Sequence, residues 1–209
     1  LLRKHRDAIL VQMPMRRKTR RHEQRISCRY ETEAYNETLR NRWDIRAGKP
    51  IEDAAGLARA LRYIVVASGD RRGTLLRLLA ARKRAIVFYM YNYERDILRD
   101  VCEALARPWG EMNGTYHDEV PQGDEWVYLV QYTSGAEAWN CTTCDTIIFY
   151  SESYSWKQVE QAKGRIDRAN TPYEDLYYIT LTSESGFDRA VERALKRKER
   201  FNEAAFGRR

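Results

Sequence analysis

The spacing of apolar residues changes character near residue 82. Before it, apolar side chains recur at helical spacing over 51–67 and through the leucine-rich stretch that follows, and a helix over 31–43 is expected after a strand near 23–30. After it, short apolar runs typical of buried strands alternate with further helical periods. The strands are expected near 84–90, 113–114, 127–132, 145–150 and 176–181, and the helices near 93–105, 155–168 and 187–201.

Strands that alternate with helices indicate β-α-β units, and therefore an α/β fold with a mostly parallel sheet. The chain has 209 residues, which suits one such domain with a short extension. We therefore divide it into a basic, mostly helical extension over 1–82 and an α/β domain over 83–209. Because the gap between the two parts is short, we expect them not to fold separately.

Basic residues concentrate at the two ends of the chain. The net charge is +7, with 37 Lys and Arg against 30 Asp and Glu. Residues 1–25 hold nine basic and two acidic side chains, residues 189–209 hold eight and three, and the middle is acidic. Such ends suit contact with a polyanion, and a solvated basic tail is the alternative. The arginines predicted to contact nucleic-acid phosphates are Arg16, Arg17, Arg20 and Arg21.

The four cysteines lack the pattern of a metal site. Cys141 and Cys144 make one C-x-x-C pair, but a structural zinc site needs four ligands and the three histidines are scattered. A redox pair would open a helix after a strand, whereas Cys144 precedes a strand-like run. We therefore predict no metal site and expect reduced thiols.

The segment from Gln161 to Arg168 holds the most informative pattern. On the expected helix, Gln161, Arg165 and Arg168 are four and three residues apart and share one face, and Gly164 leaves room for close backbone approach. Paired arginines suit a transferring phosphoryl group, because their planar, permanently charged donors meet the developing charge on oxygen. The alternative is a solvent-exposed basic face with ion pairs to Asp167.

Residues 127–172 resemble motifs V and VI of superfamily-two helicases and translocases, with the nearest likeness to DEAD/DEAH-box-like helicases of phages and prophages. In that pattern a T/S-x-G-x-x-G-x-N/D loop precedes Q-x-x-G-R-x-x-R, as residues 133–140 precede residues 161–168 here. Residues 84–94 resemble motif IV, and 113–114 the strand end after it. The resemblance spans about 60–206 and implies a RecA-like helicase C-terminal domain.

The resemblance also implies roles for individual residues. The arginines that match those reaching the γ-phosphate of ATP, and are therefore the predicted catalytic pair, are Arg165 and Arg168. The residues expected near the nucleotide are Gln161, Gly164, Gly135 and Asn140. The residues expected to contact nucleic-acid phosphates are Thr133, Ser134, Asn92, Gly114 and Thr115. Ala138 stands where the motif has its second glycine, which is a departure from the pattern.

The chain lacks the motifs that bind the ATP phosphates and Mg²⁺. Neither a G-x-x-x-x-G-K-S/T loop nor a D-E-A-D/H tetrad occurs. The chain begins without an initiator methionine, and we interpret it as a fragment of a longer protein. ATP and Mg²⁺ are therefore expected to bind with a preceding RecA-like N-terminal lobe of that protein.

These observations predict the second motor lobe of an ATP-dependent DNA helicase or translocase, with RNA as the alternative to DNA. The isolated fragment is expected to be inactive. The alternative function is a non-catalytic nucleic-acid-binding module built on a degenerate helicase lobe. No apolar run reaches the roughly 18 residues of a membrane-spanning helix. We expect a cytoplasmic location in a bacterial or phage-infected cell, with no membrane partner.

Overall fold

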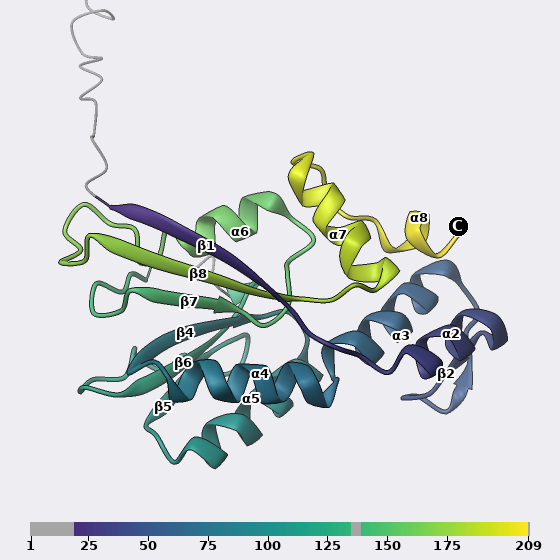
Figure 1. Cartoon of the computed structure of the whole chain (residues 1–209), viewed down its shortest axis with the longest axis horizontal. Helices are drawn as coiled ribbons and strands as arrows, with labels where there is room; N and C mark the ends of the chain where they lie inside the picture. Colours follow the sequence, from purple (N-terminus) through teal and green to yellow (C-terminus); the bar gives the residue numbers. More distant parts are fainter. Residues whose placement is uncertain (1–18, 135–138, 209) are drawn as a thin grey trace, which may run out of the picture.

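The computed structural model describes residues 19–134 and 139–208. Six parallel strands form one sheet in the order β1-β8-β7-β4-β6-β5, and β2 and β3 form a separate antiparallel hairpin (Figure 1). The strands of the sheet are β1 Arg20–Ser27, β4 Arg84–Tyr89, β5 Trp109–Met112, β6 Trp126–Gln131, β7 Thr146–Phe149 and β8 Asp175–Thr182. The hairpin strands are β2 Trp43–Asp44 and β3 Lys49–Pro50.

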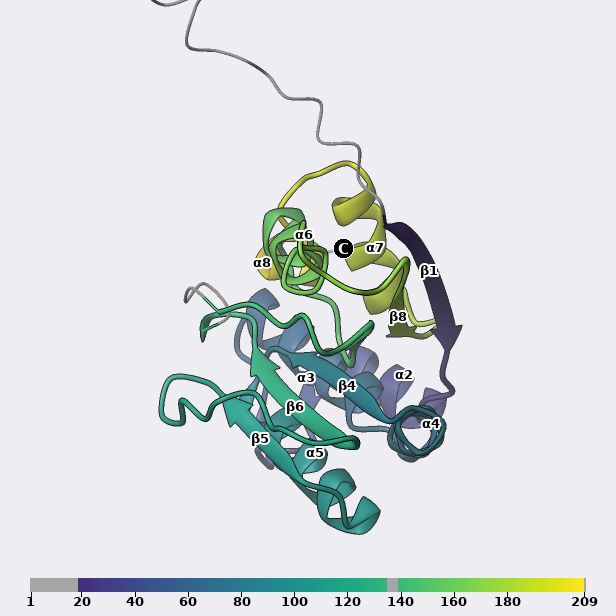
Figure 2. The same ribbon diagram turned by 90° about the vertical axis from the view of Figure 1, so that its left-hand side faces the viewer.

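Helices cover both faces of the sheet (Figure 2). One core joins the sheet to α2, α3, α6, α7 and the C-terminal segment, and the other joins it to α4 and α5. The helices are α2 Thr32–Asn41, α3 Ala54–Val66, α4 Gly69–Ala80, α5 Asn92–Leu105, α6 Trp156–Lys163, α7 Gly186–Lys196 and α8 Glu203–Gly207. This arrangement confirms the predicted α/β fold with a parallel sheet.

The central strands are apolar on both sides because each faces two helical layers. In β4, Ile86 and Phe88 enter one core, while Val87 and Tyr89 enter the other. Parallel sheets are buried on both faces in this way, so their strands appear in the sequence as continuous apolar runs. The short apolar run at the start of the α/β region is therefore a central strand of the sheet.

The first and last strands of the chain lie side by side at one edge of the sheet. β1 pairs with β8 along its whole length, from Arg20 opposite Asp175 to Ser27 opposite Thr182. α3 contributes to the same core as α6 and α7, and α8 packs against α3. The sheet and its core thus continue across residue 82, where the sequence pattern suggested a boundary.

Several expected elements end elsewhere in the structure. The helix expected near 187–201 is α7, which ends at Lys196, and the strand expected near 23–30 is β1, which ends at Ser27. The helix expected over 155–168 ends at Lys163, because the chain turns from Gly164 onward. The prediction that Gln161, Arg165 and Arg168 share one face of a continuous helix is therefore wrong. The strand expected near 113–114 is β5, which ends at Met112. No helix among the described residues is long and apolar enough to cross a membrane.

Candidate functional site

Three neighbouring strands end at one edge of the sheet, which we call the carboxyl edge. Asn92 follows β4, Thr133 and Ser134 follow β6, and Gly114 and Thr115 follow β5. Because β4, β6 and β5 are adjacent and parallel, their carboxyl ends meet there. Four of these residues are exposed, and Ser134 is half-buried. The structure thus brings the five residues to one edge, and their phosphate contacts stay a prediction.

Local hydrogen bonds shape the carboxyl edge. The side-chain amide of Gln131 donates to the Met90 carbonyl over 3.0 Å, which joins the ends of β6 and β4. After β5, the side-chain oxygen of Asn113 accepts the backbone N–H groups of Thr115 and Tyr116 at 2.9 and 3.0 Å. Such a turn is held by the asparagine itself, so the residues at its tip remain at the surface.

The predicted nucleotide residues at the end of α6 line a cavity of about 310 Å³. We call it the arginine cavity, and its lining residues are Gln161, Gly164, Arg165 and Arg168. Gly164 is the residue at which α6 ends, and a Cβ there would lie 3.3 Å from the Gln161 carbonyl oxygen. The turn after α6, rather than a longer helix, brings the four residues together.

Arg165 is the more buried arginine of the pair. It is 9% exposed, and its Nη1 donates to the Trp139 carbonyl over 2.9 Å. Its guanidinium carbon also lies 5.5 Å from the centre of the Trp139 ring. Burial, and then the charge of Arg168, lower the pKa of Arg165. Holding two cations near each other costs free energy, which an anion in the arginine cavity would offset.

Arg168 is half-buried and opens on the same cavity. Its Nε is buried and has no hydrogen-bond acceptor among residues 19–134 and 139–208. A buried donor without an acceptor costs about 1–3 kcal/mol. A phosphate oxygen in the cavity is the kind of group that would satisfy this donor.

Trp139 fixes Arg165 in place, a role that the sequence did not indicate. Its ring stacks on Phe88 with centres 6.4 Å apart and meets Tyr128 edge-on at 5.5 Å. The backbone N–H of Cys141 donates to the Arg165 carbonyl over 3.0 Å. Core packing of the Trp139 ring therefore positions an arginine that follows 26 residues later. An aromatic residue in an otherwise small-residue loop was the available signal.

The other residues predicted near the nucleotide do not line the arginine cavity. Asn140 is exposed beside it, between Trp139 and Cys141, whose backbones hydrogen-bond with Arg165. Gly135 lies outside the described residues. The predicted phosphate contacts Arg16 and Arg17 also lie outside the described residues.

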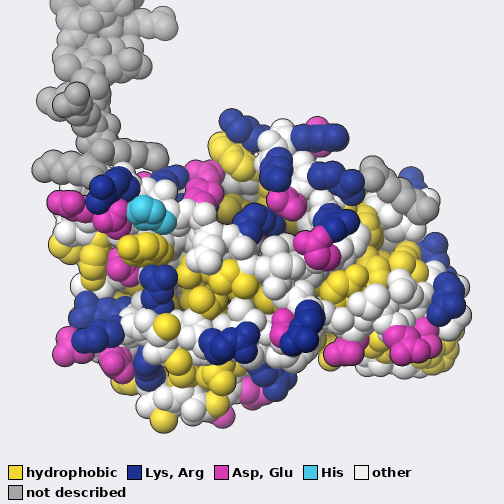
Figure 3. Space-filling view, in the orientation of Figure 1, with side chains coloured by type: hydrophobic (Ala, Val, Ile, Leu, Met, Phe, Trp, Pro, Cys, Tyr) yellow, Lys and Arg dark blue, Asp and Glu magenta, His cyan; other side chains and the backbone are white. Residues whose placement is uncertain are grey.

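Arg20 and Arg21 begin β1 and so lie at the opposite, amino edge of the sheet. Arg20 pairs with Asp175 at 2.9 Å, and Arg21 pairs with Asp167 at 2.7 Å and Glu160 at 3.2 Å. These ion pairs tie β1 to β8 and to the segment that carries the arginine cavity. Basic and acidic side chains are interspersed over the face shown in Figure 3. Nucleic-acid contact by the two arginines stays a prediction.

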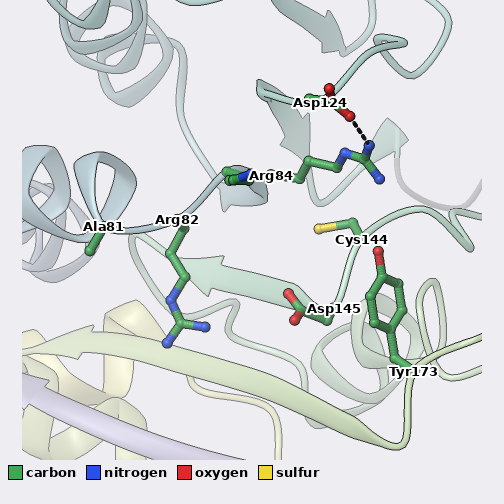
Figure 4. A pocket seen from close by; sticks show the side chains of 8 residues that line it. Ala81, Arg82, Arg84, Asp124, Cys144, Asp145 and Tyr173 are labelled. Carbon is green, nitrogen blue, oxygen red and sulfur yellow. Dashed lines mark hydrogen bonds and ion pairs between the residues drawn. The ribbon is translucent and has the colours of Figure 1, made fainter.

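A second cavity, of about 400 Å³, lies at the amino ends of β4 and β7 (Figure 4). Cys144 lines it together with Asp145, Arg82 and Tyr173. The Cys144 thiol donates to the Thr146 carbonyl over 3.2 Å, and burial raises the pKa of this thiol. In the part of the chain that the structure describes, no three His, Cys, Asp or Glu side chains are grouped to hold a metal ion.

Comparison with known proteins identifies the fold. No protein-family model matches the chain, and no curated protein matches its sequence. A solved structure, the C-terminal part of the Fun30 ATPase domain, is similar with a TM-score of 0.71. The match covers 88% of this chain and 91% of that chain at 11% sequence identity, so it shows the fold alone. The chain therefore has the RecA-like α/β fold that the sequence resemblance predicted.

Proposed function

We propose that this chain is the second motor lobe of an ATP-dependent nucleic-acid helicase or translocase. Arg165 and Arg168 act on the γ-phosphate of ATP bound to a facing lobe, and the carboxyl edge holds the nucleic-acid backbone. The observation that carries the proposal is the arginine cavity, in which both arginines meet Gln161 and Gly164.

The arginine cavity suits the terminal phosphate of ATP. The Nε of Arg168 needs an acceptor, and the charge of Arg168 lowers the pKa of Arg165, so an anion between the two arginines would be stabilised. During phosphoryl transfer, negative charge spreads over the oxygens of the transferred group, and arginines aimed at that charge lower the barrier. The exposed amide of Gln161 would respond to whether the phosphate is present and so couple the nucleotide to closure of the lobes.

Mg²⁺ would arrive with the nucleotide from the facing lobe. The sequence has no phosphate-binding loop, and the described residues offer no acidic cluster for the ion. This lobe would contribute the two arginines and its own share of the nucleic-acid surface. Closure of the lobes around ATP, and their opening after hydrolysis, would then move the protein along the nucleic acid.

We propose DNA as the nucleic acid along which the protein moves, with RNA as the alternative. The residues at the carboxyl edge are small or polar and uncharged, namely Asn92, Gly114, Thr115, Thr133 and Ser134. Such residues bind phosphate and sugar without reading base sequence. The likeness to phage and prophage helicases and the cytoplasmic location rest on the sequence alone and belong to the same proposal.

ATP hydrolysis by the protein that carries both lobes, at saturating single-stranded DNA, tests the arginine pair. Arg168→Ala should lower kcat by about 10³-fold or more, and nucleotide affinity far less. Arg168→Lys should not restore turnover, because an ammonium lacks the planar fork of a guanidinium. The matched control is Arg189→Ala, which removes an exposed arginine paired with Glu184 and should leave turnover unchanged.

The variants also separate the two functions that the sequence left open. Turnover of Arg168→Ala within about threefold of wild type would refute the catalytic assignment, because exposed surface changes have effects of that size. If nucleic-acid binding then persisted, the non-catalytic binding module would be the function that remains.

A further inference from the structure

A small cavity at the carboxyl end of β4 has the chemistry of a nucleotide site. Its volume is about 220 Å³, and its lining residues are Arg46, Arg59, Tyr91, Asn92 and Tyr93. They come from the turn of the β2–β3 hairpin, from α3, and from the start of α5. Two guanidiniums, two phenol rings and an amide line this cavity without a carboxylate, and we call it the hairpin cavity.

Arg46 is exposed, and its guanidinium lies over two aromatic rings. Its central carbon is 4.8 Å from the centre of the Tyr93 ring and 5.3 Å from that of Tyr63. No carboxylate of the described residues lies within 4.0 Å of this guanidinium. A cation held over aromatic rings, with its charge not neutralised, offers both a stacking surface and an attraction for an anion.

The aromatic side chains next to Arg46 pack against one another, and Tyr93 also packs against the core. The Tyr91 and Tyr93 rings stack with centres 5.8 Å apart at an angle of 12°, and Tyr63 meets Tyr93 edge-on at 5.1 Å. The Tyr91 hydroxyl donates to Glu203 over 3.1 Å. The hairpin cavity is therefore formed before any ligand arrives, which reduces the entropy lost on binding.

The positive charge of Arg59 is partly neutralised by neighbouring carboxylates. Its guanidinium lies 3.3 Å from Glu203 and 3.9 Å from Asp53, and its side chain is half exposed. Arg46 consequently carries most of the unneutralised charge at the cavity.

The position of the hairpin cavity relates it to the proposed nucleic-acid path. Asn92 lines the cavity and belongs to the carboxyl edge, where Thr133 and Ser134 follow the adjacent strand. A backbone crossing the ends of β5, β6 and β4 in that order would reach the cavity last. A base that leaves the stack at that point would meet Arg46 and the tyrosine rings.

We propose that the hairpin cavity binds the base of one unpaired nucleotide, stacked on the Arg46 guanidinium, while the adjoining phosphates run along the carboxyl edge. This inference rests on the proposed nucleic-acid contact and adds a base-binding site to it. Guanidinium planes and aromatic rings stack on any base, so the site favours single strands without selecting a sequence.

Binding of two labelled strands to the full 209-residue chain tests the site by fluorescence anisotropy. One is an oligothymidylate of about 12 nucleotides, and the other is an abasic strand of the same length and charge. Wild type should bind the strand with bases about tenfold more tightly or better, as expected for one stacked base. Arg46→Ala should bring the two affinities within about twofold, and Arg46→Lys should recover only part of the difference.

The matched control is Arg40→Ala, which removes another exposed arginine of the neighbouring α2 and should leave the difference intact. A single 5-iododeoxyuridine placed along the oligonucleotide should crosslink on irradiation to Tyr91 or Tyr93, as mapped by mass spectrometry. Thermal unfolding followed by circular dichroism checks that each variant is folded.

The outcomes separate the two proposals. Equal binding of both strands by wild type, or a difference that survives Arg46→Ala, would overturn the base site and leave the phosphate contacts standing. Binding of neither strand would overturn both. Thymidine monophosphate competing as strongly per molecule as the oligonucleotide would assign the cavity to a free nucleotide and overturn the proposed strand contact.

Discussion

Arg62 and Glu94 form an ion pair inside the molecule, between α3 and α5. Their side chains are 2% and 0% exposed, and the nearest guanidinium nitrogen lies 2.9 Å from a Glu94 oxygen. Arg62 also donates to the Ser151 hydroxyl over 2.8 Å. The other Glu94 oxygen accepts from Ser151 over 2.6 Å and from the Met90 N–H over 2.9 Å. The pair therefore joins the segment before residue 82 to the ends of β4 and β7.

The substitution Glu94→Gln tests whether water is excluded from this ion pair. Glu94→Gln keeps the side-chain volume and an acceptor for the Met90 N–H, but it leaves Arg62 as a buried cation without a carboxylate. Breaking a buried pair in this way costs about 3–5 kcal/mol. Domains of this kind have a free energy of unfolding of about 5–15 kcal/mol, so the variant should fold with a clearly lower urea midpoint.

Urea unfolding, followed by circular dichroism and by intrinsic fluorescence, measures this loss. Combining Arg62→Met with Glu94→Gln should recover much of it, because neither charge then remains in the interior. Arg189→Ala breaks an exposed pair and should cost less than about 1 kcal/mol. If Glu94→Gln lowered the free energy of unfolding by less than about 1 kcal/mol, the result would contradict an ion pair from which water is excluded. Two separate transitions in wild type would contradict folding of α3 with the sheet.

Three further predictions concern packing, thiols and acid. Gly207→Ala should lower stability by about 1–3 kcal/mol, because its Cβ would overlap the Ala54 backbone, whereas Gly69→Ala, which has open space, should not; urea midpoints compare the two. Burial raises the pKa of Cys102 to about 12, so Ellman's reagent at pH 8 should leave this thiol unmodified for minutes and label it on unfolding. Hydrogen bonds from His22 and then Arg20 lower the pKa of Asp175. The stabilisation by the Asp175 carboxylate is therefore present above its unfolded pKa of about 3.9 and is lost as pH falls through its lowered folded-state pKa, so the urea midpoints of wild type and Asp175→Asn should differ at pH 7 and converge in acid.

The order of strands and helices could be predicted from the sequence because it is encoded locally. The run from Ala85 to Tyr89 is apolar at every position, as a strand buried on both faces requires. The apolar positions of α5 and α7 recur at helical spacing, because each buries one side only. The grouping of Gln161, Arg165 and Arg168 was also predicted from local spacing, and their roles at the nucleotide from the resemblance to helicase motifs, although the helix that was expected to align them ends at Lys163.

The sequence did not indicate which distant residues meet. Nothing in the residues Arg20–Ser27 alone specifies that they pair with β8, about 155 positions later, because that pairing depends on how the intervening strands stack. Arg62 stands among apolar residues of α3. Its partner Glu94 comes from α5 and lies next to it only in the folded chain. Trp139 reaches Arg165 for the same reason, because packing of its ring against Phe88 in the core holds it there.

The fold class, the order of the elements and the short motif that brings two arginines near each other therefore follow from the order of residues alone. These properties depend on period and spacing over fewer than about 20 residues, which hydrophobic burial and backbone geometry impose locally. The strand order, the buried ion pair, the contact of Arg165 with Trp139 and the hairpin cavity could be seen only in the folded chain. Each of these requires groups far apart in the chain to meet, and close packing of the whole core selects which of them do.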